Sequence, residues 1–131
     1  MTGLDTNVLV RYLTQDDAKQ AARATQLIEN TLTVASPGFI SLVVLTELYW
    51  VLGNVYSVTG PEWLDTVDDL LASQRMQLEQ REVVQGTVQV CRSSKAGFVD
   101  ALIAQVAKAA GCGQTLSFDK VAVRFAGMVA V

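Results

Sequence analysis

Short apolar runs alternate with longer segments of helical periodicity along this chain, and this alternation limits the folds that it can adopt. The helical segments carry apolar residues three and four positions apart, and the runs between them have the length of strands. Strands that alternate with helices are typical of an α/β fold with a parallel sheet. We expect strands at Gly3–Leu4, Val34–Ala35, Met76–Leu78, Thr115–Phe118 and Met128–Val131, and helices over about residues 6–13, 16–30, 42–55, 61–73, 81–92 and 98–110.

Local signals mark several ends of these helices. Thr6 or Asn7 can cap the first helix, because a hydroxyl or amide oxygen accepts hydrogen bonds from the unpaired N–H groups of a first turn. Pro61 suits the first turn of a later helix, where its missing N–H is not needed. Gly111 is placed to end the last expected helix, since glycine readily adopts the left-handed conformation found there.

The length of 131 residues predicts a single domain over residues 1–131. Half of the residues are hydrophobic and two are proline, which is typical of a well-folded chain. The longest apolar stretch, residues 39–52, contains Ser41, Thr46 and Glu47 and is too short and too polar to span a bilayer. The N-terminus has no charged leader followed by a long apolar run. We therefore expect a cytoplasmic protein that does not enter a membrane.

The chain contains no histidine, which excludes histidine-based acid–base catalysis, serine triads and zinc sites that use histidine. Cys91 and Cys112 are too few for a disulfide framework and lack the paired spacing of a zinc site. We interpret both as small buried side chains with reduced thiols. Any catalysis must therefore come from carboxylates, hydroxyls, lysines or a bound metal ion.

Asp5 and Asp119 each follow a short apolar strand directly. Open parallel sheets place their ligands at the carboxyl ends of strands, so two acids at such ends can converge on one site. The alternative for either residue alone is a helix cap or a turn.

Glu47 is unusual because its helical neighbours offer it no lysine or arginine as a partner. A lone charge on an apolar helix must reach solvent, a metal ion or another polar group, since its burial costs several kcal/mol. The neighbours at three and four residues' distance are Val43, Val44, Trp50 and Val51.

Asp100 falls just past the edge of the apolar arc of its helix, beside Ala104 and Ala107. These small side chains leave room for a ligand close to the helix. The alternative is an ordinary first-turn acid that the helix dipole stabilises.

The set of four carboxylates, Asp5, Glu47, Asp100 and Asp119, is more informative than any one of them. Carboxylates about 4 Å apart repel by about 4 kcal/mol per pair at an effective dielectric of 20, so four of them can share a site only around a cation. Ligation by oxygen alone selects a hard ion such as Mg²⁺ or Mn²⁺.

Four segments of the chain, in order and over nearly its whole length, resemble the PIN-domain pattern of VapC-type toxins: Leu4–Arg11, Glu47, Phe98–Ile103 and Thr115–Asp119. The resemblance implies a three-layer α/β/α domain with a central parallel sheet of four to five short strands. It also implies that Asp5, Glu47, Asp100 and Asp119 hold one or two divalent ions and hydrolyse single-stranded or looped RNA. Such a protein is a Mg²⁺-dependent endoribonuclease and the toxin of a toxin–antitoxin pair.

Residues beside the acids extend this resemblance and also show one departure from it. Thr6, Asn7 and Ser117 match supporting hydroxyl or amide positions that flank the family's acids. Lys120 and Val121 follow Asp119 where the family often has a further acid. The missing acid removes a ligand that could help to hold a second metal ion.

Other functions fit the same residues less well. A metal-dependent phosphatase of the haloacid-dehalogenase kind needs a second aspartate two residues after the first, and Asn7 occupies that position. A receiver domain needs an acidic pair at the end of its first strand, and a dinucleotide fingerprint needs a third glycine where Leu116 stands. A non-catalytic PIN-like protein-interaction domain remains open as an alternative.

The sequence pI of about 4.8 argues against binding a nucleic acid through net charge. The charge is uneven, however, with −6 over residues 1–69 and +3 over residues 70–131. Basic side chains in the second segment could follow an RNA backbone, and so could Arg11 near the first acid. The candidates for RNA contact are Arg11, Arg92, Lys95, Lys120 and Arg124.

The helix that carries Glu47 has apolar residues around most of its circumference, and packing on one sheet cannot bury all of them. Part of this apolar surface is therefore expected to contact another chain. The resemblance implies a homodimer and an antitoxin that inserts a segment into a groove near the acids. The expected target is a transfer-RNA or ribosomal-RNA loop, because exposed loops let bases unstack and be recognised.

Overall fold

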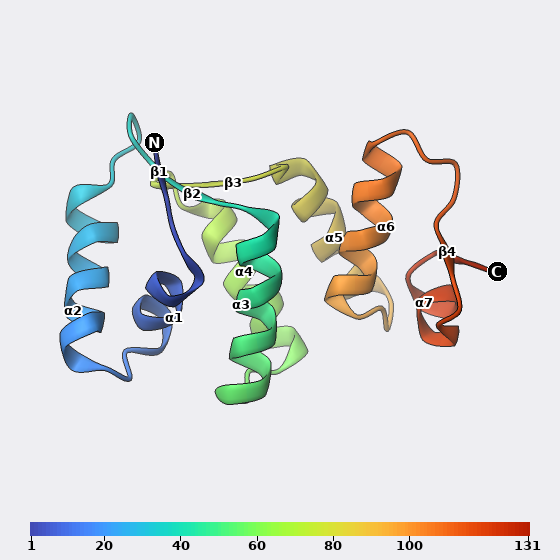
Figure 1. The fold of residues 1–131 in the computed structure, drawn as a ribbon, viewed down its shortest axis with the longest axis horizontal. Helices are drawn as coiled ribbons and strands as arrows, with labels where there is room; N and C mark the ends of the chain where they lie inside the picture. Colours follow the sequence, from blue (N-terminus) through green and yellow to red (C-terminus); the bar gives the residue numbers. More distant parts are fainter. The chain divides into compact units, whose positions relative to one another are not determined.

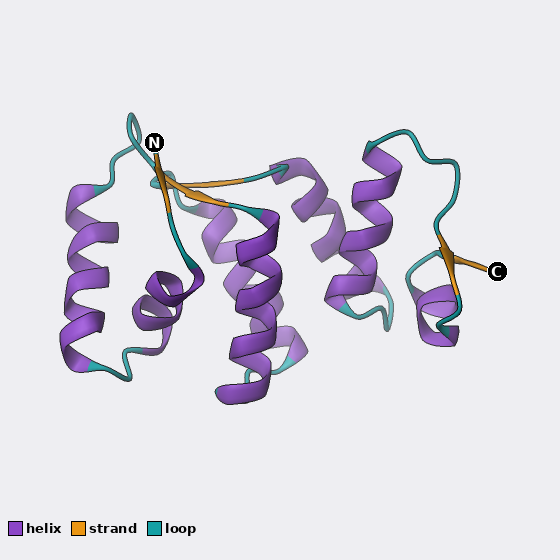
Figure 2. Ribbon diagram, viewed as in Figure 1, coloured by secondary structure: helices purple, strands orange, loops and turns teal.

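The computed structural model describes all residues from 1 to 131. The chain divides into two compact units, Met1–Glu79 and Gln80–Val131, and each is described by itself below. Helices account for most of both units, and the strands are short (Figures 1 and 2). The mixture of helices with parallel strands confirms an α/β protein. One domain over residues 1–131 stays a prediction.

The first unit begins with a short strand and three helical segments. They are β1 (Thr2–Gly3), α1 (Thr6–Thr14), α2 (Ala18–Gln26) and the π-helical turn η1 (Leu27–Thr31), which continues α2 directly. The remaining elements are β2 (Gly38–Ile40), α3 (Leu42–Val55), α4 (Gly60–Ala72) and β3 (Met76–Leu78). The expected helix over residues 42–55 and the expected strand over 76–78 are thus confirmed at their predicted bounds.

The strands of the first unit form one parallel sheet in the order β1-β2-β3. Gly3 pairs with Phe39, and Phe39 pairs with Gln77 on the other side. Gly38 in β2 is buried, and a Cβ atom at this position would lie 2.7 Å from Leu4 Cδ1. Because Gly38 has no side chain, the side chain of Leu4 can pack closely against it, next to Asp5 in the chain.

Helix packing builds the core of the first unit. Helix α1 packs on both α2 and α3, and α4 packs on β3. Ring contacts join Tyr49 to Trp63, with centroids 5.5 Å apart. The fully buried side chains of this unit include Leu9, Ile40, Leu45, Leu48, Trp63 and Val67. Because α1 and α3 share this core, the residues at the ends of these two helices are held in fixed positions relative to one another.

The second unit is a helix pair followed by a small βαβ motif. Helices α5 (Arg81–Ser93) and α6 (Phe98–Ala109) pack against each other. Ala110 is the C-cap of α6, and Gly111 follows it with a φ of 99°, so the glycine occupies the left-handed position just after the cap. The motif consists of β4 (Leu116–Ser117), α7 (Lys120–Phe125) and β5 (Val129–Ala130), in which β4 and β5 are parallel.

The expectation of a single central sheet of four to five strands is wrong. The chain has one sheet of three strands and another of two. Each strand has only two or three residues and so forms few backbone hydrogen bonds. The apolar pattern of such short strands does not specify which of them pair.

Two further expectations about elements need correction, and one helix was not expected. Residues 34–35 form no strand, and the second strand instead begins at Gly38, directly after Pro37. The first helix is capped by Asp5 rather than by Thr6 or Asn7. Helix α7 was not expected, because its six residues are too few to show helical periodicity.

The cysteines are free, but they are not both buried as expected. Cys91 is half-buried, and this burial raises the pKa of its thiol. Cys112 is exposed in the turn after α6, where a polar loop surrounds it. No helix combines the length and apolar content that a bilayer span requires.

Candidate active site

Asp5 stands between β1 and α1, at the carboxyl end of the strand. Its Oδ1 atom accepts a hydrogen bond of 2.7 Å from the backbone N–H of Thr6, and the residue is the N-cap of α1. This is the cap role that the sequence left open for Asp5. Its Oδ2 atom has no hydrogen-bond partner in the protein, so the exposed carboxylate keeps one oxygen for a ligand.

Glu47 lies on the exposed side of α3 and is joined to Asp5 by a single residue. The buried Thr6 donates its hydroxyl hydrogen bond to Glu47 Oε1, while its backbone N–H binds Asp5. Glu47 Oε2 has no partner in the protein. Thr6 therefore binds one oxygen of each acid and leaves the other oxygen of each free, so both acids lie beside the same residue.

A cavity of about 300 Å³ opens beside these two acids. Asp5, Thr6, Asn7 and Glu47 form its polar end. Apart from Arg11, its other walls are apolar or aromatic, with Val10 buried and Val55 exposed. The lining residues beyond the polar end are Val10, Arg11, Val51, Val55 and Tyr56.

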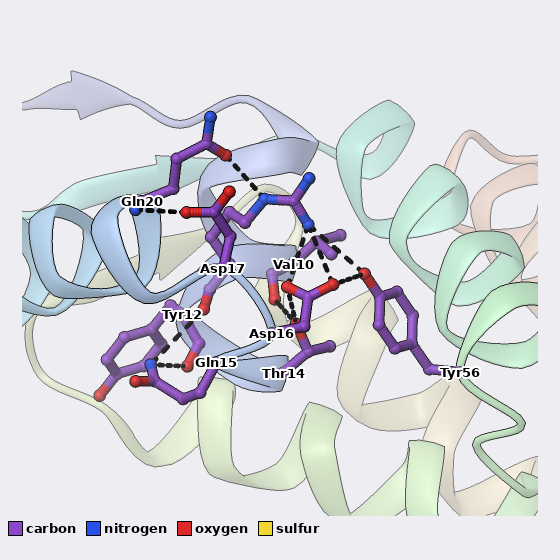
Figure 3. Close-up of polar contacts among 9 residues, drawn as sticks. Val10, Tyr12, Thr14, Gln15, Asp16, Asp17, Gln20 and Tyr56 are labelled. Atoms are coloured by element: carbon purple, nitrogen blue, oxygen red, sulfur yellow. Dashed lines mark hydrogen bonds and ion pairs between the residues drawn. The ribbon is translucent and has the colours of Figure 1, made fainter.

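Arg11 is not a free cation at this cavity. Its Nη1 atom lies 3.1 Å from Asp16 Oδ1, and its Nε donates a hydrogen bond of 2.7 Å to Gln20 Oε1. Tyr56 completes the network, because its hydroxyl donates to Asp16 Oδ2 and accepts from Arg11 Nη1 (Figure 3). We call the three side chains of Arg11, Asp16 and Tyr56 the Arg–Asp–Tyr network.

The network stabilises the charged forms of its members. The Tyr56 hydroxyl is the main cause that lowers the pKa of Asp16, and a hydrogen bond from Thr14 lowers it further. A hydrogen bond with Tyr56 is also the main cause that raises the pKa of Arg11. Arg11 and Asp16 therefore stay ionised throughout the neutral range.

Asp100 lies in the first turn of α6 and is half-buried. Its carboxylate accepts no hydrogen bond and forms no ion pair in the protein. The nearby Gly97 would place a Cβ atom 3.8 Å from Asp100 Oδ2, so this glycine leaves space beside the carboxylate. The first-turn position agrees with the helix-dipole alternative, and the free oxygens leave a ligand role open.

Asp119 caps α7 at the carboxyl end of β4. Its Oδ1 atom accepts hydrogen bonds from the backbone N–H groups of Val121 at 2.8 Å and Ala122 at 3.0 Å. Ser117 Oγ accepts the backbone N–H of Asp119 at 2.9 Å and so sets the turn that presents the acid. The cap uses one carboxylate oxygen and leaves Oδ2 free.

The basic candidates in the second unit are all exposed. Arg124 places its guanidinium carbon 5.0 Å from the centre of the Phe125 ring, a cation–π contact on α7. The other three are Arg92 near the end of α5, Lys95 in the loop after it and Lys120 at the start of α7.

Two acids at the site were missed by the sequence analysis. Glu79 follows β3 at the same carboxyl edge as Asp5, but its Oε1 atom accepts the backbone N–H of Leu42 at 2.7 Å and so caps α3. Asp16 begins the helix expected over residues 16–30, but it lies before α2 and forms an ion pair with Arg11 beside the cavity. The position of Glu79 directly after an apolar strand was a signal available in the sequence.

The donors present suit a hard divalent ion. Within each unit taken by itself, no group of three or more His, Cys, Asp or Glu side chains lies close enough to hold a metal ion. Asp5 and Glu47 nevertheless offer one free carboxylate oxygen each, without competition from lysine or arginine. An all-oxygen pair of this kind suits Mg²⁺ or Mn²⁺ better than the softer zinc or copper ions.

The comparisons with known proteins agree with this chemistry. The family model described as PIN domain matches residues 4–128, and the chain therefore belongs to the PIN-domain family. Members of this family are typically metal-dependent nucleases, so a nuclease function is supported. A comparison with curated protein sequences finds no significant match.

Proposed function

We propose that this PIN-domain chain is a Mg²⁺-dependent endoribonuclease and the toxin of a toxin–antitoxin pair. The family match over residues 4–128 supports the nuclease class. The observation that carries the proposal is the arrangement of Asp5, Thr6 and Glu47, in which the backbone N–H of Thr6 binds one acid and its hydroxyl binds the other beside a cavity.

Asp5, Glu47, Asp100 and Asp119 would hold the ion, and each keeps at least one carboxylate oxygen free of protein hydrogen bonds. A bound divalent ion lowers the pKa of a water molecule and stabilises charge on a phosphate oxygen. Thr6 holds Glu47 in one rotamer, and Ser117 holds the turn at Asp119. The exposed amide of Asn7 lines the cavity and is placed to donate to a phosphate oxygen.

The reaction follows from the residues available. With no histidine in the chain, the proton of the attacking water passes to a carboxylate or to solvent. The water oxygen forms the new bond to phosphorus, and the bond from phosphorus to the 3′ oxygen breaks. The products therefore carry 5′-phosphate and 3′-hydroxyl ends, and 2′,3′-cyclic phosphate products would contradict the mechanism.

The purified chain tests this proposal with transfer RNA and ribosomal RNA fragments that contain single-stranded loops. We expect cuts at one or two loops in Mg²⁺ or Mn²⁺, no cuts in chelator, and loss of cutting in Asp5→Asn. Glu82→Gln removes an exposed first-turn acid outside the site and serves as the matched control. Cutting that persists in chelator would contradict the metal role, release of terminal phosphate alone would indicate a phosphatase, and no reaction would favour a non-catalytic interaction domain.

The partners are proposed on the same basis. Helix α3 buries Leu45, Leu48 and Leu52 but leaves Val43 and Trp50 more than half exposed. These two residues lie on the same side of the helix as Glu47, at spacings of four and three residues. We propose that this surface contributes to a homodimer or to the antitoxin complex. Size-exclusion chromatography at micromolar concentration tests the dimer, and a strict monomer would contradict it.

A further inference from the structure

The cavity beside Asp5 and Glu47 has a second end that metal binding does not use. This end is formed by Val51, Val55, Tyr56 and Arg11, about one to three helical turns along α1 and α3 from the acids. The volume of about 300 Å³ lies at the small end of the range for organic ligands. An apolar wall with one aromatic ring and one polar group is suited to a flat heterocycle.

Arg11 is held at this end in one orientation with part of its hydrogen-bonding capacity unused. Gln20 takes the Nε proton, and Asp16 and Tyr56 take the Nη1 protons. The Nη2 amino group has no acceptor in the protein. Because its neighbours already fix the side chain, little conformational freedom is lost when Nη2 donates to a ligand.

Charge argues for a neutral ligand at this end. The charged side chains at the cavity and in the Arg–Asp–Tyr network are one cation, Arg11, and three anions, Asp5, Glu47 and Asp16. A phosphate would add to the negative charge, and with Nη1 bound to Asp16 and Nε bound to Gln20, neither pair of adjacent N–H groups of Arg11 is free for a bidentate contact. A carbonyl oxygen on a neutral ring needs only the single donor that Nη2 offers.

We infer that this end of the cavity binds one nucleobase of the RNA strand that the acids cleave. The base packs on Val51, Val55 and Tyr56, and an exocyclic carbonyl of the base accepts from Arg11 Nη2. The inference rests on the proposed function, since it takes RNA to be the substrate. Guanine, uracil and cytosine carry such a carbonyl and adenine does not, so the site selects against adenine.

Binding of short RNA strands tests this inference without cleavage. The probes are fluorescein-labelled heptamers of adenosine in which the central base is A, G, U or C, measured by fluorescence anisotropy with Ca²⁺ in place of Mg²⁺. We expect the G, U and C strands to bind about tenfold more tightly than the all-adenosine strand, as for one hydrogen bond to a charged donor. Circular dichroism checks that each variant is folded.

Arg11→Gln is expected to remove this preference while the four strands still bind. Tyr56→Phe keeps the ring but removes the hydroxyl that holds Arg11, so it should reduce the preference in part. The matched control is Arg23→Gln, which removes an exposed positive charge from α2 outside the cavity and should leave the preference intact.

Two results would overturn the inference. The first is equal binding of all four strands by the wild-type protein. The second is an equal loss of affinity for all four strands in both Arg11→Gln and Arg23→Gln, which would make Arg11 a phosphate contact. The cleavage assay with Mg²⁺ is separate: a base preference without any cleavage would contradict the proposed function and leave the base site standing.

Discussion

Asp5 in the first unit and Asp119 in the second occupy equivalent local positions with different surroundings. Each follows a parallel strand and caps the next helix with its Oδ1 atom. Asp5 is further linked through Thr6 to Glu47, which is 42 residues away in the chain, whereas Asp119 is supported by Ser117 two residues before it. The first acid therefore depends on packing between helices, and the second depends on its own turn.

The two units also differ in net charge. Residues 1–79 carry four basic and ten acidic side chains, a net charge of −6, and residues 80–131 carry six basic and three acidic side chains, a net charge of +3. The negative unit holds the linked acid pair and its cavity. The positive unit holds the four exposed cations that are candidates for phosphate contacts. The two units therefore differ in net charge, although each contains two of the four proposed metal-binding acids.

The largest expected effect is the loss of cleavage when an acid of either unit becomes an amide. We expect Asp5→Asn and Asp119→Asn each to lower the cleavage rate by at least about 100-fold, since even the supporting partners of metal ligands are worth about 10- to 100-fold. Rates on a single loop RNA measure the effect. Full activity of Asp119→Asn beside an inactive Asp5→Asn would restrict catalysis to the first unit.

The next effect concerns folding and tests whether residues 1–131 behave as one domain. Leu48 in the first unit and Leu102 in the second are both buried, and replacement of either by alanine should lower the free energy of unfolding by about 2–5 kcal/mol. If the chain is one cooperative domain, both variants shift the same single transition in urea, followed by circular dichroism. Two transitions, with each variant shifting only one, would show that the units unfold separately.

Removal of the hydroxyl of Thr6 or of Ser117 should affect the two acids to different extents. Thr6→Val keeps the buried shape but removes the hydrogen bond to Glu47, and we expect about 10- to 100-fold weaker Mn²⁺ binding by calorimetry. Ser117→Ala should have a much smaller effect, because the exposed Asp119 retains its two capping bonds to the backbone N–H groups of Val121 and Ala122. Equal losses in the two variants would contradict the difference described above.

The smallest expected effect is on the pH dependence of stability. Hydrogen bonds with Thr59 in a capping box lower the pKa of Glu62 at the start of α4. A lowered pKa in the folded state stabilises the protein above the pKa of the unfolded state, near 4.5, and this stabilisation is lost as the pH falls through the lower folded value.

Glu62→Gln should therefore flatten the dependence of unfolding free energy on pH below about 5. The control is Glu82→Gln in the first turn of α5, whose N-cap Gln80 makes no side-chain capping bond. Urea midpoints between pH 3 and pH 7 give the comparison. A larger change in Glu82→Gln than in Glu62→Gln would show that the capping box is not the cause.

Local patterns in the chain were enough to predict most of the elements and the positions of the strand-end acids. The helix over residues 42–55 and the strand over 76–78 were predicted at their observed bounds, because apolar periodicity and turn residues act within a few positions. Asp5 and Asp119 were predicted at strand ends for the same reason. The six-residue helix α7 was missed because so short a segment shows no period.

Contacts between distant residues could not be predicted in this way. The bond from Thr6 to Glu47 spans 41 residues and that from Tyr56 to Asp16 spans 40, and both exist because α1 packs against α3. The pairing of β4 with β5, apart from the sheet of three strands, likewise depends on which short backbones meet. Periodicity states which face of an element is apolar, but the choice of partner is made by packing, since many partners satisfy the same apolar face.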